Sequence, residues 1–434
     1  MSLYDKASIV LIPSGFKSGS TDNLYSVLPA NGNGDFNATR GSTATRVNKD
    51  GLIESVASNV PRLDYPLTSG VAGDCPHLLL EPSRTNLITY SEDFTQWTNT
   101  GSETTDTANS ATSPDGSLNS TKLQEADSSF GYHRLSKSIT ASSGTDYSLS
   151  FFAKKGTKSF VQLLLINTSN SEAASKVFDL QNGTVGETIV NGSATLTDSK
   201  IEDFGNGWFR CTIVAQLSTT PNTFRINLAN AATGNTSSLG MVQYTGDSNG
   251  NIFIWGAQLE EASFITSYIP TSGSTVTRSA DLCIDSGTSA EFNASEGVLF
   301  IECSMFTNSG QNNYFSIGDT TGTRDGVELH FRTESNRIRG IIYSSDSVTV
   351  NFDTTSFDKT NNNKIAFKYK DNDFAIWVNG SQANTRTSGA GPLKLSKLQF
   401  SDANNGNIWY GKCKQAIVFN EALTDAELTT LTTQ

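Results

Sequence analysis

The sequence predicts an all-β fold in which an extended N-terminal arm is followed by two antiparallel β-sandwiches and one short C-terminal helix. Short apolar or alternating runs recur along the chain, separated by Gly, Asn and Ser clusters, which is the pattern of strands and tight turns. The chain has 434 residues, 24 Phe and 12 Tyr, and 36% of its residues are apolar. The aromatic and β-branched content can build sheet cores, and the length exceeds what one core usually supports.

Residues 1–76 are predicted to form the extended arm, because neither a helical nor a strand period persists there. Turn clusters such as 31–35 interrupt the apolar stretches. Such a segment buries too little surface to order itself, so we expect it to lie on its own module or on a neighbouring subunit. The apolar run 9–12 is too short for a signal-peptide core, and no window reaches the length of a membrane span.

The first sandwich is predicted over residues 77–270. Its strand candidates are short, apolar or alternating, and bounded by turn residues, at 147–153, 160–166, 208–214, 224–228 and 252–255. Several antiparallel strands at this spacing favour a sandwich or jelly roll. A Ser, Thr and Gly-rich stretch then predicts a linker at 271–281.

The second sandwich is predicted over residues 282–434. Its strand candidates are 298–303, 327–331, 338–343, 365–369 and 374–378. The last two flank an Asp-Asn-Asp sequence, whose turn chemistry predicts a hairpin.

One helix is predicted at the end of the chain. Thr424 and Glu427 have the spacing of a capping box, and Leu423 and Leu428 occupy the positions of a hydrophobic staple. We expect this helix to cap the second sandwich.

Charge and cysteine usage narrow the class of partner. The net charge of -12 argues against nucleic acid, which needs clustered Lys and Arg to displace counterions. The cysteines are widely spaced and odd in number, without a C-x-x-C pair for zinc or redox chemistry. We therefore expect buried thiols in a protein assembled in a reducing cytoplasm. The five are Cys75, Cys211, Cys283, Cys303 and Cys413.

Two segments frame the first sandwich. Residues 77–87 read HLLLEPSRTNL, and residues 255–272 begin with WGAQLE and end with SYIPTS. Together with 2–8 and 44–52, they resemble the opening of tailed-phage structural proteins, in which a carbohydrate-binding-module-like domain follows. The first sandwich is similar to that domain through SEDFTQW at 91–97 and further short elements at 207–210 and 244–247.

Residues 282–434 resemble a concanavalin A-like, laminin G-type jelly roll, through FAIWVNG at 374–380 and FNEALT at 419–424. The resemblance implies a non-enzymatic virion structural protein: a head fibre, a capsid decoration or a tail-associated fibre. Such a protein is assembled in the bacterial host cytoplasm, binds other virion proteins through its arm, and can form a homo-oligomer. The alternative is an adhesin that recognises a host surface polysaccharide.

Sequence patterns for catalysis are weak. Residues 246–250 match the G-x-S-x-G nucleophile elbow, but a strand rather than a helix follows, so we expect a surface turn. A glycosidase needs two carboxylates across a cleft, and the E-x-D-x-x-E run of concanavalin-like hydrolases is missing from the sequence. We predict that the chain is not an enzyme.

The remaining candidates are binding residues. Trp208, Trp255 and Trp377 lie within apolar strand runs, where core packing is expected. The aromatic residues in more polar surroundings are the candidates for glycan binding: Trp97, Tyr132, His133 and Tyr314. No cofactor is expected other than calcium, which takes carboxylate and amide oxygens from flexible turns. The alternative for those turns is ordinary Asn/Asp chemistry; the residues concerned are Asp247, Asn249 and Asn251, and Asp402, Asn404 and Asn407.

Overall fold

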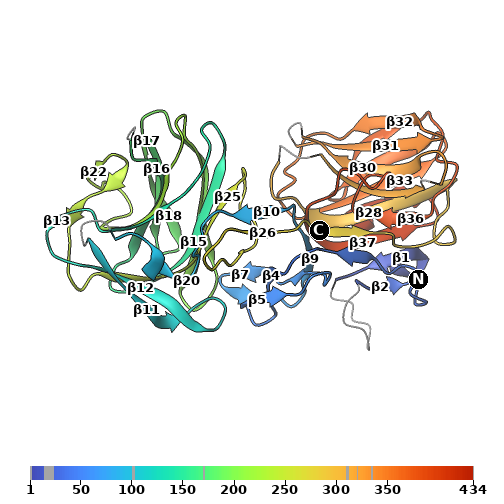
Figure 1. Cartoon of the computed structure of the whole chain (residues 1–434). Coiled ribbons are helices and arrows are strands. Elements are labelled where there is room, and N and C mark those ends of the chain that lie inside the picture. Colours follow the sequence, from blue (N-terminus) through green and yellow to red (C-terminus); the bar gives the residue numbers. More distant parts are fainter. Residues whose placement is uncertain are drawn as a thin grey trace.

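The computed structural model describes residues 2–13, 24–99, 103–169, 172–308, 312–319, 321–333 and 336–433. Within these residues the chain consists mostly of strands, with α1 (Asp425–Thr432) as the one α-helix. The strands form two sandwiches at opposite ends of the molecule, and strands of the N-terminal segment lie between them and along the second (Figure 1). The predicted all-β fold class is confirmed.

The first sandwich has two sheets that enclose one core, in which Leu149, Phe151 and Leu163 are fully buried. Its six-stranded sheet has the order β11 (Thr104–Thr112), β12 (Leu118–Glu125), β25 (Asn251–Glu261), β15 (Tyr147–Lys155), β20 (Trp208–Gln216) and β19 (Thr195–Asp203). Its five-stranded sheet has the order β14 (Arg134–Ser138), β21 (Thr223–Ala229), β16 (Phe160–Asn167), β17 (Glu172–Asp179) and β18 (Thr184–Asn191).

The outer face of the six-stranded sheet is also covered. On β15, Leu149 and Phe151 point into the sandwich core, whereas Phe152 joins a second cluster outside it. That outer cluster contains Trp208, Trp255 and Tyr268 of the first sandwich and Ile53 of the N-terminal segment. The N-terminal segment therefore packs on the sheet face that looks towards the second sandwich.

The second sandwich is built in the same way around Leu299, Phe315 and Phe367. Its larger sheet runs β2 (Ser26–Leu28), β1 (Ala7–Leu11), β37 (Gly411–Phe419), β28 (Glu296–Ser304), β33 (Asn363–Lys370), β34 (Phe374–Val378) and β35 (Ser381–Arg386), with β9 (His77–Leu80) and β6 (Leu63–Asp64) attached. Its five-stranded sheet runs β32 (Ser347–Asp353), β31 (Ile338–Ser344), β30 (Asp325–Phe331), β29 (Asn313–Asp319) and β36 (Lys397–Gln399). The predicted hairpin is β33 with β34.

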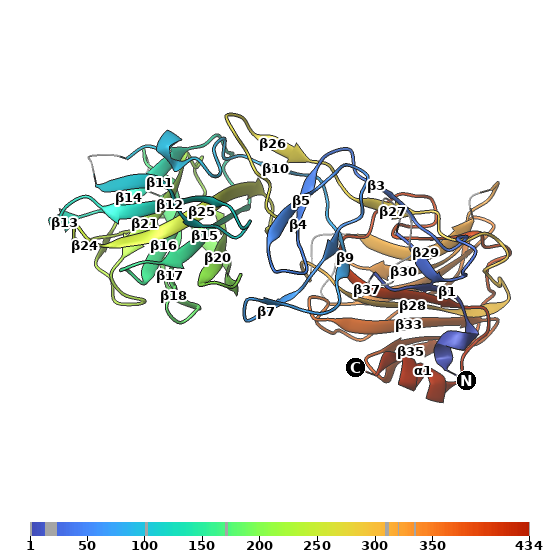
Figure 2. The same ribbon diagram turned by 90° about the horizontal axis from the view of Figure 1, so that it is seen from below.

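Short paired strands complete the structure. They are β4 (Ala44–Val47) with β5 (Ile53–Val56), β7 (Leu67–Thr68) with β8 (Val71–Ala72), β3 (Asn37–Thr39) with β27 (Leu282–Ile284), β10 (Arg84–Asn86) with β26 (Val276–Arg278), β13 (Phe130–Gly131) with β24 (Tyr244–Thr245), and β22 (Ser237–Ser238) with β23 (Met241–Val242). The pair β10 and β26 joins the first framing segment to residues 276–278, which follow the second one. The hairpin β4–β5 lies between the sandwiches in both views (Figures 1 and 2).

The described part of residues 1–76 lies on its own chain. Strand β1 pairs along β37, with Val10 opposite Ile417 and Leu11 opposite Ala416. Ile9 and Leu11 are fully buried in the core of the second sandwich. The apolar run 9–12 thus supplies most of a buried strand, because its alternate residues can face the core while its backbone pairs with a neighbouring strand.

Helix α1 begins as predicted. The side chain of Thr424 accepts a hydrogen bond from the backbone N–H of Glu427, and the Glu427 carboxylate accepts one from the Thr424 N–H. Leu423 and Leu428 are buried together in a cluster on the outer side of the larger sheet, and α1 contacts β33, β34 and β35. Among the described helices, which include the 3-10 helices η1 (Leu3–Lys6) and η2 (Phe94–Gln96), none has the length and hydropathy of a membrane span.

Replacing the helix cap tests this reading of the C-terminus. Thr424→Ala removes both hydrogen bonds of the Thr424 hydroxyl, so we expect the free energy of unfolding to fall by about 1 kcal/mol. Chemical denaturation followed by circular dichroism measures the change. Thr430→Ala, on the exposed side of the same helix, is the matched control and is expected to be neutral or slightly stabilising, because Ala favours helix more than Thr.

Candidate functional site: the cleft between the two sandwiches

Five charged side chains meet where the sandwiches join, and we call them the junction cluster: Arg40, Arg62, Glu81, Arg278 and Asp281. An Arg62 nitrogen lies 2.6 Å from Glu81 and an Arg278 nitrogen 2.8 Å from the same carboxylate. Arg62 also pairs with Asp281, which lies 2.9 Å from Arg40. All five side chains are at most 6% exposed, so each charge depends on its neighbours rather than on water.

The junction cluster draws on three separate stretches of chain. Arg40 and Arg62 come from the N-terminal segment, Glu81 from the first framing segment, and Arg278 and Asp281 from residues 271–281 between the sandwiches. Burial alone would raise the pKa of Glu81, but the charges of Arg278 and Arg62 outweigh burial and hold that pKa well below its usual range. Glu81 stays ionised and ties the three stretches together.

Glu81 is fully used as an acceptor. The backbone N–H and the hydroxyl of Ser267 each donate a hydrogen bond to it at 2.7 Å. Next to it, the hydroxyl of Thr45 in β4 donates to the carbonyl of Tyr268 at 2.5 Å. The two framing segments and the hairpin β4–β5 are therefore joined by direct hydrogen bonds.

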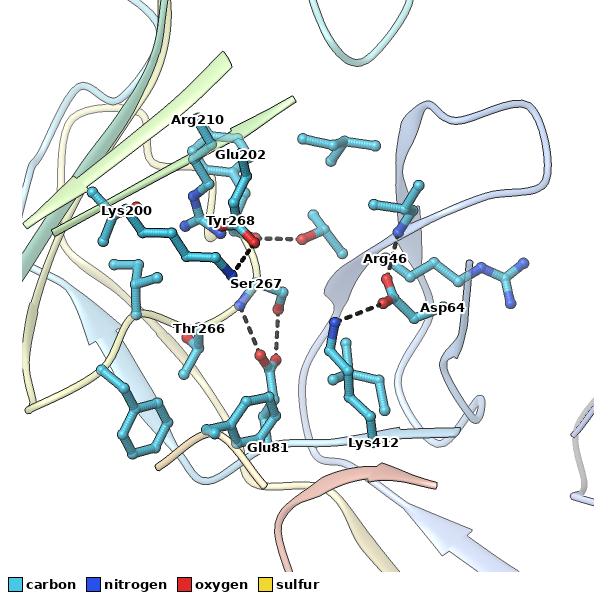
Figure 3. Close-up of a pocket in the computed structure, with 18 of the residues that line it drawn as sticks. Arg46, Asp64, Glu81, Lys200, Glu202, Arg210, Thr266, Ser267, Tyr268 and Lys412 are labelled. Carbon is cyan, nitrogen blue, oxygen red and sulfur yellow. Dashed lines mark hydrogen bonds and ion pairs between the residues drawn. The ribbon is translucent and has the colours of Figure 1, made fainter. Parts of the chain in front are cut away.

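Beside the junction cluster lies a cleft of about 410 Å³. Its walls are the outer face of β19 and β20, the hairpin β4–β5, residues 264–268, and residues 304–306 of the second sandwich. Figure 3 shows Lys200, Glu202 and Arg210 reaching into the cleft from the first sandwich, opposite Asp64 and Lys412. A volume of this order suits a small ligand.

The charged groups of the cleft differ in how they are paired. Lys200 and Glu202 pair at 2.5 Å, and Lys412 lies 3.8 Å from Asp64. Asp64 lies 2.9 Å from His77. Burial lowers the pKa of His77, although the hydrogen bond to Asp64 acts in the opposite direction. Arg210 contacts the hydroxyl of Ser150 through Nε and Nη2, at 3.2 and 3.1 Å.

The predicted glycan-binding residues of the first sandwich do not form one site. Trp97 is 6% exposed and packs in the core against Phe94 and Phe224, with ring centroids 4.9 and 5.5 Å away. His133 is 1% exposed and contacts the ring and the carbonyl of Tyr244. The guanidinium of Arg134 lies over the ring of Tyr132, 4.5 Å from its centroid. Trp97 and His133 are therefore buried, and the Arg134 guanidinium covers one face of the Tyr132 ring.

Tyr314 lies in a different environment. It stands on the outward side of β29 and stacks on His330 of β30, with centroids 4.0 Å apart and planes 9° apart. Both rings are half-buried. Burial raises the pKa of Tyr314 to about 12. On the same face Arg324 lies 3.7 Å from the ring centroid of Tyr343 and pairs with the buried Glu328 at 2.5 Å.

The His330 ring provides a pH test of this face. Burial, assisted by the charges of Arg339 and Arg332, lowers the pKa of His330 to about 4. The unfolded chain binds this proton near pH 6.5, so stability is expected to fall as the pH drops from about 6.5 to about 4. NMR titration of the Cε1 proton should give a midpoint near pH 4, and His330→Gln removes the signal. A midpoint near 6.5 would show that the ring is freely solvated.

The two predicted calcium loops keep their residues close together, but their oxygens serve the loops themselves. Asp247 accepts a hydrogen bond from the N–H of Asn249, and the carbonyl of Asn249 accepts one from the side chain of Asn251. Asp402 accepts hydrogen bonds from the N–H groups of Asn404 and Gly406 and from the side chain of Asn407. Within the described residues, no three His, Cys, Asp or Glu side chains cluster as metal ligands. Calcium binding stays a prediction.

The G-x-S-x-G match at 246–250 lies in a turn that leads into β25. The backbone N–H of Gly250 donates a 2.6 Å hydrogen bond to the carbonyl of Asp247. The nearest described histidine to this turn, His133, is buried against Tyr244. The sequence expectation of a turn agrees with this geometry.

No known protein-family model matches the chain, and no curated protein does. Among solved structures, the CBM40 domain of Ruminococcus gnavus IT-sialidase, bound to alpha2,3 sialyllactose, is 15% identical, with a TM-score of 0.28 over 32% of this chain and 84% of that one.

Two further structures have lower identities. Trypanosoma rangeli sialidase is 9% identical, with a TM-score of 0.27 over 72% of this chain and 60% of that one. Domains LG4-5 of the mouse laminin alpha1 chain are 9% identical, with a TM-score of 0.22 over 70% of this chain and 93% of that one. Scores this low do not establish function, which therefore rests on the residues of this chain.

Proposed function

We propose that the chain is a non-enzymatic structural protein of a tailed-phage particle, as a head fibre, a capsid decoration or a tail-associated fibre, and that it displays its two sandwiches as one rigid unit. The observation that carries this proposal is the junction cluster, which fastens the N-terminal segment, the first framing segment and residues 271–281 to one another.

The residues that resemble phage structural proteins have definite positions at this junction. Glu81 belongs to the first framing segment and accepts from Ser267 of the second. Asn86 donates hydrogen bonds to the carbonyls of Ala257 and Ile269. Thr45, from the 44–52 stretch, donates to Tyr268. The motifs thus describe a way of joining modules, which suits a surface protein that must hold its domains in a fixed geometry.

Purified particles test the proposal. Mass spectrometry of gradient-purified particles is expected to find the chain in a fixed copy number, and a cryo-EM map is expected to show two sandwiches outside the shell or along the tail. Particles that lack the gene product should regain this density when the purified full-length protein is added. Absence of the chain from infectious wild-type particles would contradict the proposal.

A second candidate function is binding of host glycan by the second sandwich. The observation that favours it is the Tyr314–His330 stack on the outward face of the five-stranded sheet, with Arg324 and Tyr343 on the same face. Rings of this kind can pack against a sugar ring while neighbouring polar groups donate hydrogen bonds. A glycan array should then show specific binding that Tyr314→Ala weakens at least tenfold.

The matched control is Tyr4→Ala. Tyr4 is 43% exposed and bonds to Gln415 of the larger sheet of the same sandwich, so its removal should leave glycan binding unchanged. If the wild-type protein bound no glycan on a broad array, or if both variants lost glycan binding equally, the adhesin function would be contradicted. Neither result would affect the display proposal.

A further inference from the structure

Arg210 lies beside the junction cluster and forms no ion pair among the described residues, although Glu202, which pairs with Lys200, lies opposite it on β19. The nearby Arg40, Arg62 and Arg278 all form ion pairs. Arg210 is also buried, at 6% exposed, but it contacts only neutral groups: the hydroxyl of Ser150 and the ring of Phe152, whose centroid lies 5.4 Å away. A buried charge without an opposite charge in contact is costly to keep, so its position calls for an explanation.

The side chain two residues further along β20 is also unsatisfied. Thr212 lines the same cleft and is 5% exposed, and its hydroxyl oxygen has no hydrogen-bond partner among the described residues. Residues two apart on a strand share one face, so Arg210 and Thr212 offer donors side by side. Lys200 lies opposite Thr212 on β19. The three form a polar wall on one side of the cleft.

The other surfaces of the cleft are partly aromatic. Phe204, Phe264 and Phe306 line it, and the last two stack across the gap between the sandwiches with centroids 5.4 Å apart. The lining also carries four acidic and four basic side chains, the acids being Asp64, Glu81, Asp198 and Glu202. This balance disfavours a doubly charged phosphate and is compatible with a ligand that has one negative charge and an otherwise neutral, hydroxyl-rich body.

We propose that the cleft binds a carboxylate-bearing sugar, with its carboxylate on the Arg210 guanidinium and the Thr212 hydroxyl and its ring against the phenylalanines. Guanidinium and carboxylate form the strongest and most directional of the common hydrogen-bonded pairs. The cleft volume of about 410 Å³ accommodates one or two sugar units. The proposal goes beyond the display function and uses none of the residues of the Tyr314 face.

Calorimetry with defined sugars tests this site on the full-length protein. We expect D-glucuronate or D-galacturonate to bind with a dissociation constant below about 1 mM, equivalent to roughly 4 kcal/mol, and D-glucose and D-galactose to bind at least tenfold more weakly. Arg210→Gln should weaken uronate binding at least tenfold. An oligogalacturonate is tested in parallel. If it binds more tightly than the monomer, the cleft is a site for a polymer; if it does not, the cleft is a site for the free sugar acid.

The first sandwich offers a matched control variant. Arg225 contacts the hydroxyl of Ser136 through Nε at 3.1 Å on the opposite sheet, in the manner of Arg210 with Ser150, and it lies outside the cleft. Arg225→Gln should leave binding unchanged. Because Arg210→Gln can disturb folding, the side-chain Nε–H resonance of Arg210 in the ¹⁵N-labelled wild-type protein is a second readout, and it should shift on adding glucuronate.

Three results would overturn the proposal. The first is that neither uronate binds at a concentration ten times the expected dissociation constant. The second is that the neutral sugars bind as tightly as the uronates. The third is that the Arg210 resonance does not shift at saturating uronate. A glycan array that shows no binding by the Tyr314 face does not affect these measurements, so the two proposed sites are tested independently.

Discussion

Replacing Arg62 by methionine is expected to lower the free energy of unfolding by about 3–5 kcal/mol, because it leaves Glu81 and Asp281 buried with too few partners. Arg62 is fully buried and contacts both carboxylates. Methionine fills much of the space of the arginine stem. The loss of stability therefore measures the effect of removing the charge and not the effect of creating a cavity. Urea denaturation measures the change at low ionic strength.

The control for this substitution is Arg46→Met. Arg46 pairs with Glu54 at 2.7 Å, but their side chains are 26% and 36% exposed, and such pairs contribute roughly 0–1 kcal/mol. We also expect Arg62→Met to make residues 271–281 sensitive to protease. A loss below 1 kcal/mol, equal to that of Arg46→Met, would show that the junction cluster does not hold the sandwiches together.

The same cluster determines the behaviour in acid. The pKa of Glu81 lies below its ordinary value in the folded protein, so the unfolded chain takes up this proton first as the pH falls. The stabilisation is therefore complete above the ordinary carboxylate range and is lost only as the pH drops towards the lowered folded-state pKa. Arg62→Met should move the onset of acid unfolding to higher pH.

Trp97→Ala is expected to cost about 3–5 kcal/mol, because it removes a large buried ring from between Phe94 and Phe224. The indole N–H also donates a 2.9 Å hydrogen bond to the carbonyl of Tyr90, which would lose its partner. Hydrogen-exchange mass spectrometry should show faster exchange in β14 and β21 of the first sandwich, and unchanged protection in β28 and β33 of the second.

The control is Phe130→Ala, an aromatic residue of the same sandwich that is 61% exposed. It should change stability by at most about 0.5 kcal/mol. If Trp97→Ala had an effect as small as Phe130→Ala, Trp97 would have to be free of the core. The expected result also means that loss of glycan binding in Trp97→Ala would report unfolding and not recognition.

Local pattern was enough to predict the strands and the final helix. Runs such as 147–153 and 365–369 are too apolar and too rich in β-branched and aromatic residues for turns, and the capping box at Thr424 depends on neighbours in sequence. Both kinds of feature are decided within a few residues. Their prediction requires no knowledge of the tertiary fold.

The junction cluster could not be found in this way. Arg62 and Asp281 are separated by 219 residues, and Arg40 and Asp281 by 241. Each lies in a turn-rich stretch where a charged residue usually faces water. The framing motifs singled out the segment that contains Glu81, but they did not indicate which arginines pair with Glu81. The one sequence feature that could have indicated the cluster is that its arginines and acids lie within otherwise apolar or proline-flanked segments.

Polar surroundings in sequence were a poor guide to exposed aromatics. Trp97 and His133 are flanked by Thr, Gln, Tyr and Arg, yet both are almost completely buried. The reason is that loops at the end of a sandwich fold back over its open core, as η2 does when it carries Phe94 and Trp97 inward. Tyr314 faces outward because its neighbours Phe315 and Ile317 take the core positions of β29.

The pairing of β1 and β9 with β37 has a consequence for synthesis of the chain. Both N-terminal strands pair along β37, and the hydroxyl of Ser8 bonds to the carbonyl of Val418 across 410 residues of sequence. During synthesis β1 and β9 are therefore made long before β37, and their edges stay unpaired in that interval. Contacts at such separation form slowly and leave aggregation-prone edges open. Chains cut short before residue 411 would therefore lack the strand that joins β1, β9 and β28, and their second sandwich would stay incomplete.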